Sequence, residues 1–176
     1  MAASAFVSSG LLAPAVSSPG PVPTPVPAPR PARLLIPSLG LDATVEEVGL
    51  DAVGAMGTPH FIWNVGWFNS GPAPGAAGDA VIDGHHGLPG QPLIFNGLGQ
   101  LPVGGLITVV GADGSRRDFA VTSSMSWPAD SHPAGLFETA GAARLTLITC
   151  DGAYFRGSQT YADRLVVEAS LLGSGG

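Results

Sequence analysis

The chain has 176 residues, of which 45% are hydrophobic and only 11% are charged. This length is enough for one domain with a substantial core and too short for two. The formal net charge is -6 and the chain contains no lysine, which argues against a nucleic-acid partner because phosphate binding needs clustered basic side chains. The single cysteine excludes an intramolecular disulfide bond.

The N-terminal segment is predicted to be a flexible leader and linker over residues 1–32. Residues 2–16 are largely apolar, but serine, glycine and proline interrupt them and no basic residue precedes them. They match neither a membrane span of about 20 apolar residues nor a signal peptide, so a membrane anchor is not evident. Proline then occupies nearly every second position of 17–32. This favours an extended spacer, with a proline-rich recognition motif as the alternative.

The folded part is expected to begin at Arg33, where short apolar segments start to alternate with turn residues. This alternation is typical of β-strands, and Pro37 and Gly40 separate the first two. The Asp113-Gly114 pair predicts a hairpin. Further strands are predicted at 79–83, 106–111, 118–125, 144–150 and 164–169.

These segments predict an all-β fold with a short helix or a loop at 92–101. The clustered aromatic residues Trp63, Trp67 and Phe68 are expected in the core or at its rim. About seven short strands favour a closed barrel, since closure removes exposed strand edges, and a sandwich is the alternative. The domain is predicted to span 33–172, followed by a flexible tail at 173–176.

Cys150 is the first candidate for chemistry. A lone cysteine after an apolar run is ordinarily a buried, inert side chain. Here, however, the strand-like run 145–149 ends at Cys150, just before Asp151-Gly152, and strand ends are where a rigid scaffold presents side chains to a ligand. Catalysis by this thiol requires a histidine, and preferably an arginine, close to it in space.

His85 and His86 follow the strand-like segment 80–84, whose last residue, Gly84, permits a sharp turn. The alternatives are an exposed, solvated pair or a metal site. Two adjacent histidines and one cysteine do not reproduce a recognised zinc spacing, so we expect no metal.

Arg164 begins the last predicted strand, with thirteen residues between it and Cys150. That span is long enough to connect two neighbouring antiparallel strands, which would place Arg164 beside the thiol. The alternative is a surface arginine paired with Asp163 or Asp151, because such ion pairs are common and weak.

Three segments of the chain together resemble the sortases, and in particular the class F sortases of actinobacteria. They are RLLIPSLGLDATVEEVGLD, VGWFNSGPAPGAAGDAVIDGHH, and LTLITCDGAYF with the later YADRLVVEA, which together extend from Arg33 to Ala169. The resemblance implies a closed eight-stranded β-barrel with short helices or 3-10 turns in its loops. It also implies that the cysteine and arginine lie on adjacent strands and that the histidine lies on a facing loop.

The resemblance further implies a cysteine transpeptidase. Cys150 would attack the Thr-Gly bond of a motif like Leu-Pro-x-Thr-Gly, and an amine would release the product. His85, chosen because the histidine of the family follows glycine, would carry protons, and Arg164 would stabilise the oxyanion or the motif backbone. Thr149 and His86 are expected to contact substrate.

No cofactor and no metal are expected. The expected partners are the sorting-motif peptide of a surface protein and an amine acceptor of the cell wall or a pilin. By the same resemblance, we expect a monomer at the extracellular face of the cell membrane, attached only through an N-terminal anchor that this sequence does not make evident.

Two other functions remain open from the sequence. One is a cysteine peptidase or other hydrolase that uses the same thiol with water as the acceptor. The other is a non-catalytic β-barrel binding module in which Cys150 is a buried core thiol.

Overall fold

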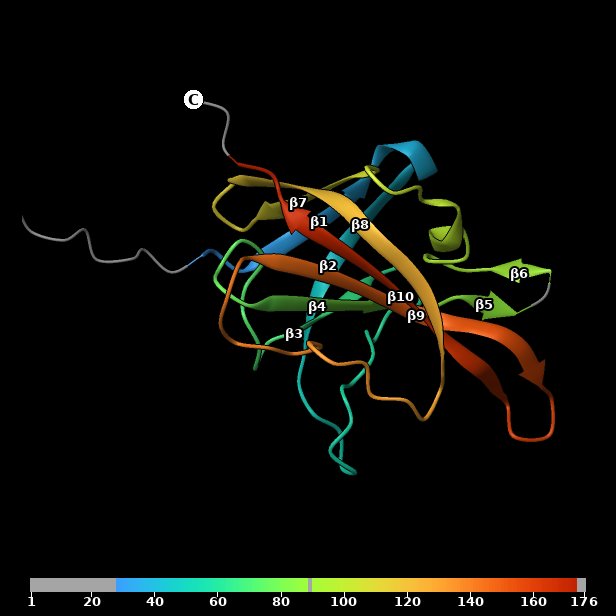
Figure 1. The fold of residues 1–176 in the computed structure, drawn as a ribbon. Coiled ribbons are helices and arrows are strands. Elements are labelled where there is room, and N and C mark those ends of the chain that lie inside the picture. Colours follow the sequence, from blue (N-terminus) through green and yellow to red (C-terminus); the bar gives the residue numbers. More distant parts are fainter. Residues whose placement is uncertain (1–27, 89, 174–176) are drawn as a thin grey trace, which may run out of the picture.

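A computed structural model describes residues 28–88 and 90–173. The predictions for the leader and most of the linker, and for the last three residues of the tail, lie outside the described residues. Within the described part, eight strands close into a barrel in the spatial order β1-β2-β3-β4-β9-β10-β8-β7 (Figure 1). The predicted fold class, an all-β closed barrel, is confirmed.

The barrel strands differ in length, from four residues to thirteen. β2 pairs in parallel with β3, and β4 pairs in parallel with β9, while the other neighbouring pairs are antiparallel. In chain order the barrel strands are β1 (Pro31–Ile36), β2 (Leu41–Val48), β3 (Val65–Phe68), β4 (Asp79–Gly84), β7 (Leu106–Gly111), β8 (Arg116–Pro128), β9 (Arg144–Phe155) and β10 (Thr160–Leu171).

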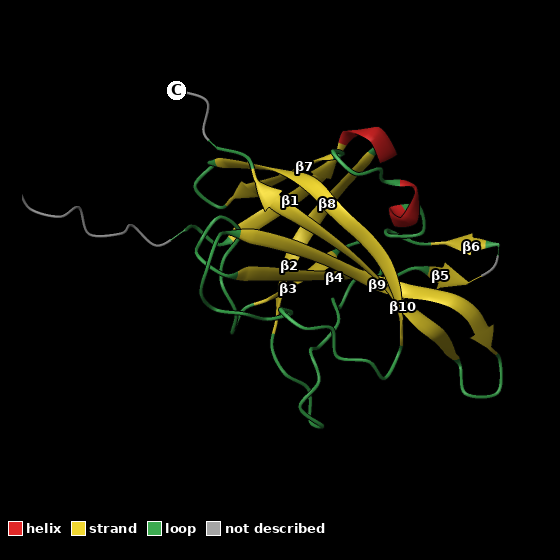
Figure 2. Ribbon diagram, in the orientation of Figure 1, coloured by secondary structure: helices red, strands yellow, loops and turns green. Residues whose placement is uncertain are grey.

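The connecting segments contain little regular structure. β5 (Gly87–Leu88) and β6 (Gln91–Pro92) form a small separate hairpin. Two short 3-10 turns, η1 (Pro37–Leu39) and η2 (Leu98–Gln100), are the helical elements of the described residues, drawn red in Figure 2. The segment 92–101, predicted as a short helix or a loop, contains the 3-10 turn η2. No helix in the part that the structure describes is long and apolar enough to cross a bilayer.

Alternate residues of the long strands fill the barrel interior, as the two-residue period of a strand requires. The intervening residues, among them Ile148, Cys150 and Arg164, therefore lie on the outer face of the barrel. Inward side chains from three neighbouring strands include Ala80, Ile82, Leu145, Leu147, Leu165 and Val167, all buried in the core. This alternation places the candidate site on the outside of a rigid sheet.

One strand of the barrel was not predicted, and one predicted hairpin is confirmed. β3 was not predicted as a strand because it is only four residues long; its Trp67 is buried in the core, whereas Trp63 is 58% exposed and is not a core residue. The predicted hairpin at Asp113-Gly114 does join β7 to β8, and Gly114 adopts the left-handed φ of 79° that such a turn requires.

The prediction that Cys150 lies at a strand end is wrong, because β9 continues to Phe155 and β10 begins at Thr160 rather than Arg164. Gly152 has a φ of 75°, and the register between the two strands shifts opposite it. Gly152 and Ala153 thus oppose Ala162 alone and form a β-bulge that bends the strand without ending it. Beyond the bulge, β9 and β10 form an arm that projects from the barrel beside the β5–β6 hairpin (Figure 1).

Candidate active site

Cys150 on β9 and Arg164 on β10 are directly opposite each other across two antiparallel strands. Opposed Cα atoms in such pairs lie about 4.5–5.5 Å apart, and their side chains share one face of the sheet. The predicted adjacency of these two residues is therefore present. Both side chains are partly exposed on the outer face.

The Arg164 guanidinium is held along its own strand. Its Nη1 donates to the backbone carbonyl of Asp163 at 2.9 Å and to that of Tyr161 at 3.4 Å. In the described residues it forms no salt bridge with Asp163 or Asp151, the alternative that the sequence left open. Asp151 instead accepts a hydrogen bond from the Ser126 hydroxyl. The positive charge of Arg164 thus stays available to a ligand.

The backbone around His85 is fixed by packing and hydrogen bonds. A Cβ at Gly84 would lie 2.6 Å from the ring of Phe95, so only glycine allows this ring to pack against the end of β4. Thr149 is buried, and its hydroxyl donates to the Gly84 carbonyl at 2.7 Å. The Phe95 N–H donates to the His85 carbonyl at 2.9 Å. β9 and the 92–101 segment therefore hold the turn that carries His85.

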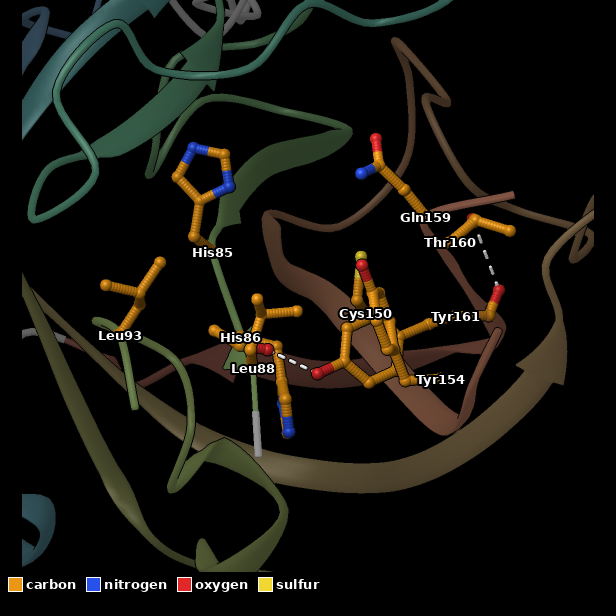
Figure 3. A pocket seen from close by; sticks show the side chains of 10 residues that line it. His85, His86, Leu88, Leu93, Cys150, Tyr154, Gln159, Thr160 and Tyr161 are labelled. Carbon is orange, nitrogen blue, oxygen red and sulfur yellow. Dashed lines mark hydrogen bonds between the residues drawn. The ribbon is translucent and has the colours of Figure 1, made fainter. Parts of the chain in front are cut away.

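His86 points away from His85, and the two imidazoles lie in opposite directions in Figure 3. The His86 ring packs edge-to-face against Tyr161, with 5.3 Å between ring centroids. Its Nδ1 is buried and has no hydrogen-bond partner. The two adjacent histidines therefore occupy different surroundings.

Two hollows meet at Cys150 and His85. The first, which we call the arginine cleft, has a volume of about 370 Å³ and also contains Arg164, Thr149 and Asp83 on its walls. It brings together Cys150, His85 and Arg164, the three predicted catalytic residues. Apolar side chains complete it, including Met56 from the loop after β2 and Phe137 from the loop before β9.

The second hollow, the tyrosine cleft, has a volume of about 250 Å³ and is shown in Figure 3. Tyr154 and Tyr161 of the projecting arm form one wall, and their rings lie 5.1 Å apart. Leu88 of the small hairpin lines the opposite side, next to His86. The Tyr161 hydroxyl donates to the Gly87 carbonyl and so links the two walls.

Three titratable lining residues were missed by the sequence analysis: Asp83, Tyr154 and Tyr161. Burial raises the pKa of Asp83 to about 7, with the negative charge of Glu46 adding to the shift, and one oxygen of this carboxyl has no partner. Burial, followed by the neighbouring Cys150 and Tyr154, raises the pKa of Tyr161. A charged residue in the otherwise apolar run before Gly84 was the available signal for Asp83. No sequence signal pointed to the two tyrosines, because the arm that carries them was not predicted.

Comparisons with known proteins agree with this fold. A family model described as the sortase domain matches residues 34–172. Sortase C1 from Streptococcus agalactiae is similar in structure, with a TM-score of 0.62 and 22% identity over 82% of this chain and 68% of that one. Sortase C-1 from Actinomyces oris has a TM-score of 0.63 and 23% identity over 81% of this chain and 73% of that one. Sortase A from Corynebacterium diphtheriae has a TM-score of 0.64 and 20% identity over 84% of this chain and 62% of that one.

A search of curated proteins gives no significant match. The closed barrel is the fold of these sortases. Because the sortase domain matches most of its length, this chain belongs to the sortase family.

Proposed function

We propose that this sortase cleaves a motif like Leu-Pro-x-Thr-Gly between Thr and Gly and transfers the acyl part to an amine. The observation that carries the proposal is that Cys150, His85 and Arg164, which are distant in sequence, line one cleft. The motif resemblance supports a class F enzyme that acts at the extracellular face of the membrane on surface proteins.

In the first half of the reaction, the Cys150 thiolate attacks the carbonyl carbon of the motif threonine. A C–S bond forms, the C–N bond to glycine breaks, and His85 gives its proton to the leaving amine. In the second half, a neutral amine attacks the thioacyl carbon. A C–N bond forms, the C–S bond breaks and His85 takes the proton from the attacking nitrogen, so one residue serves both directions.

Arg164 is assigned to the developing oxyanion or the motif backbone. Two backbone carbonyls hold one end of its guanidinium, which leaves the other donors of this planar group free for the substrate. Such a donor stabilises the transition state more than the ground state when it is fixed before the reaction begins. Arg164 has this fixed geometry.

The sorting peptide is assigned to the arginine cleft, where Thr149 shapes the wall and Phe137 and Met56 supply apolar contacts. Cys150 is partly exposed at the junction of two clefts, which supports a catalytic thiol over a core thiol in a binding module. The chemistry derived for these residues requires no metal and no cofactor.

A turnover assay tests the proposal. A fluorogenic Leu-Pro-x-Thr-Gly peptide is incubated with the full chain, with and without triglycine, and the products are separated by mass. Transpeptidation gives an amide product whose amount rises with triglycine concentration, and Cys150→Ala gives none. If water is the sole acceptor at every amine concentration, the protein is the alternative cysteine hydrolase. If no sorting peptide is cleaved, the enzymatic proposal is wrong.

A further inference from the structure

We propose that the tyrosine cleft is the binding site of the amine acceptor. The inference rests on the proposed transpeptidation, because it names the site of the second substrate of that reaction. Its starting point is that the two clefts share Cys150 and His85, while Arg164 lines only the arginine cleft. An acyl group in the arginine cleft leaves the tyrosine cleft as the second lined approach to the sulfur.

The lining of the tyrosine cleft suits an uncharged amine. Among the described residues, no aspartate, glutamate or arginine lines it. An amine can attack a thioacyl carbon only in its neutral form, and a cleft without fixed charge does not oppose the loss of its proton. The faces of Tyr154 and Tyr161 and the side chains of Leu88 and Leu93 fit a narrow arm of methylene or peptide groups.

A further hollow adjoins the tyrosine cleft. It has a volume of about 360 Å³, shares His86, Leu88, Tyr154 and Tyr161 with the cleft, reaches Gly152 on the arm, and is lined by no aspartate, glutamate or arginine of the described chain. In the proposed arrangement the two hollows together form the path of the amine to Cys150.

The walls of this path are assembled before a ligand arrives. The Tyr161 hydroxyl ties the arm to Gly87. Gly87 has a φ of 87°, and a Cβ there would lie 2.3 Å from the Gln91 carbonyl, so the small hairpin requires glycine at this position. His86 packs on Tyr161, and its buried Nδ1 has no partner, so an unsatisfied polar atom is left beside the cleft.

Aminolysis of the thioacyl enzyme needs only the amine, Cys150 and His85. The amine nitrogen bonds to the thioacyl carbon, the C–S bond breaks, and the sulfur leaves as the Cys150 thiolate. The proton released by nitrogen goes to His85, which lines both clefts. An amide product and the free enzyme result.

Leu88→Trp tests the inference, because Leu88 is exposed and lines both hollows, so a larger side chain there narrows the path. The readout is the ratio of amide product to hydrolysis product. Both products come from the same thioacyl enzyme, so a change in its rate of formation does not alter the ratio. Three amines are compared: triglycine, Nα-acetyl-lysine methylamide and hydroxylamine. The first two distinguish an N-terminal amine from a side-chain amine, and hydroxylamine is small enough to reach the thioester without filling the path.

For whichever extended amine the wild type uses, Leu88→Trp is expected to lower the ratio about tenfold, with less than about a twofold change for hydroxylamine. Tyr161→Phe, which keeps the ring and removes the link to Gly87, is expected to raise KM for the amine about threefold and serves as a second variant if the first fails to fold. Phe155→Ala, on the same arm but outside both hollows, is the matched control and should leave the ratio unchanged.

An unchanged ratio in both cleft variants, or an equal loss with all three amines, overturns the inference. This failure is distinguishable from failure of the proposed function. In the first case peptide cleavage and thioacyl formation persist while the cleft variants leave acceptor use unaffected. In the second case no thioacyl enzyme forms at all.

Discussion

The two clefts that meet at Cys150 differ chiefly in charge. The arginine cleft contains Arg164 and the buried carboxyl of Asp83, whereas no aspartate, glutamate or arginine of the described chain lines the tyrosine cleft. The first is suited to stabilising the charge that develops on a peptide oxygen, and the second to receiving a neutral nucleophile. One sulfur atom can therefore serve two chemically different half-reactions because its two sides are built differently.

The two adjacent histidines differ in the clefts that they line. His85 lines both clefts, and His86 lines only the tyrosine cleft. In the proposed assignment His85 therefore faces both substrates and His86 faces only the amine, so changing each in turn should separate the half-reactions.

The largest effect is expected from His85→Ala, measured beside His86→Ala. Loss of a general acid and base costs about 10²–10⁴ in rate, so His85→Ala should slow both thioacyl formation and aminolysis by that factor. His86→Ala should act mainly on the amine step, seen as a higher KM for amine. The two steps are followed separately by single-turnover peptide cleavage and by the amine dependence of product. The assignment is reversed if His86→Ala stops peptide cleavage and His85→Ala does not.

Arg164→Lys tests whether the arginine cleft needs a guanidinium group. Lysine supplies a charge without the planar set of donors, so kcat/KM for the sorting peptide should fall about 10²-fold. Arg156→Lys is the control, because Arg156 is exposed on the arm and lines neither cleft. Wild-type kcat/KM in Arg164→Lys would mean that this arginine has a structural role only.

Asp83→Asn tests the buried carboxyl through the pH dependence of stability. The folded-state pKa of about 7 lies above the ordinary value of 3.8, so the folded state favours protonated Asp83. The associated stability is complete below pH 4 and is lost as the pH rises toward 7. Asn has no proton to lose, so the variant should gain about 4 kcal/mol relative to wild type between pH 4 and pH 8.

Urea unfolding at both pH values measures this gain. Asp130→Asn, at an exposed position, is the control and should show no such trend. A stability difference that does not change with pH would show that Asp83 is ionised in the folded protein throughout this range.

Thr149→Val has the smallest expected effect. It removes the hydrogen bond to the Gly84 carbonyl while keeping a β-branched side chain, so unfolding free energy should fall by about 1–2 kcal/mol. Peptide cleavage should also slow, because this bond holds the turn that carries His85. Thr149→Ser retains the hydroxyl and should behave nearly as wild type. Equal losses in both variants would assign the effect to packing instead of the hydrogen bond.

Sequence reasoning was most successful where local pattern and spacing decide the structure. The thirteen residues between Cys150 and Arg164 predicted neighbouring strands, and the alternating run before Cys150 predicted β9. The glycine turn at Gly114 was equally local. These features depend on periodicity and backbone conformation, which the sequence displays directly.

Sequence reasoning failed where contacts between residues distant in the chain decide the structure. Asp151-Gly152 looked like a strand end, and only pairing with β10 shows that a bulge at Gly152 and Ala153 and then an arm follow Asp151. Without the arm, Tyr154 and Tyr161 had no reason to be grouped with Cys150. Likewise, the raised pKa of Asp83 comes from burial in the fold and from Glu46 on another strand, neither of which local pattern reveals.

The most direct test is the intact mass of the protein after rapid mixing with a Leu-Pro-x-Thr-Gly peptide and acid quench. We predict an adduct on Cys150 equal in mass to the fragment ending at threonine, which forms without amine and disappears when amine is added before the quench. A protein that cleaves this peptide while Cys150 never carries the fragment would contradict a thioacyl intermediate at the junction of the two clefts.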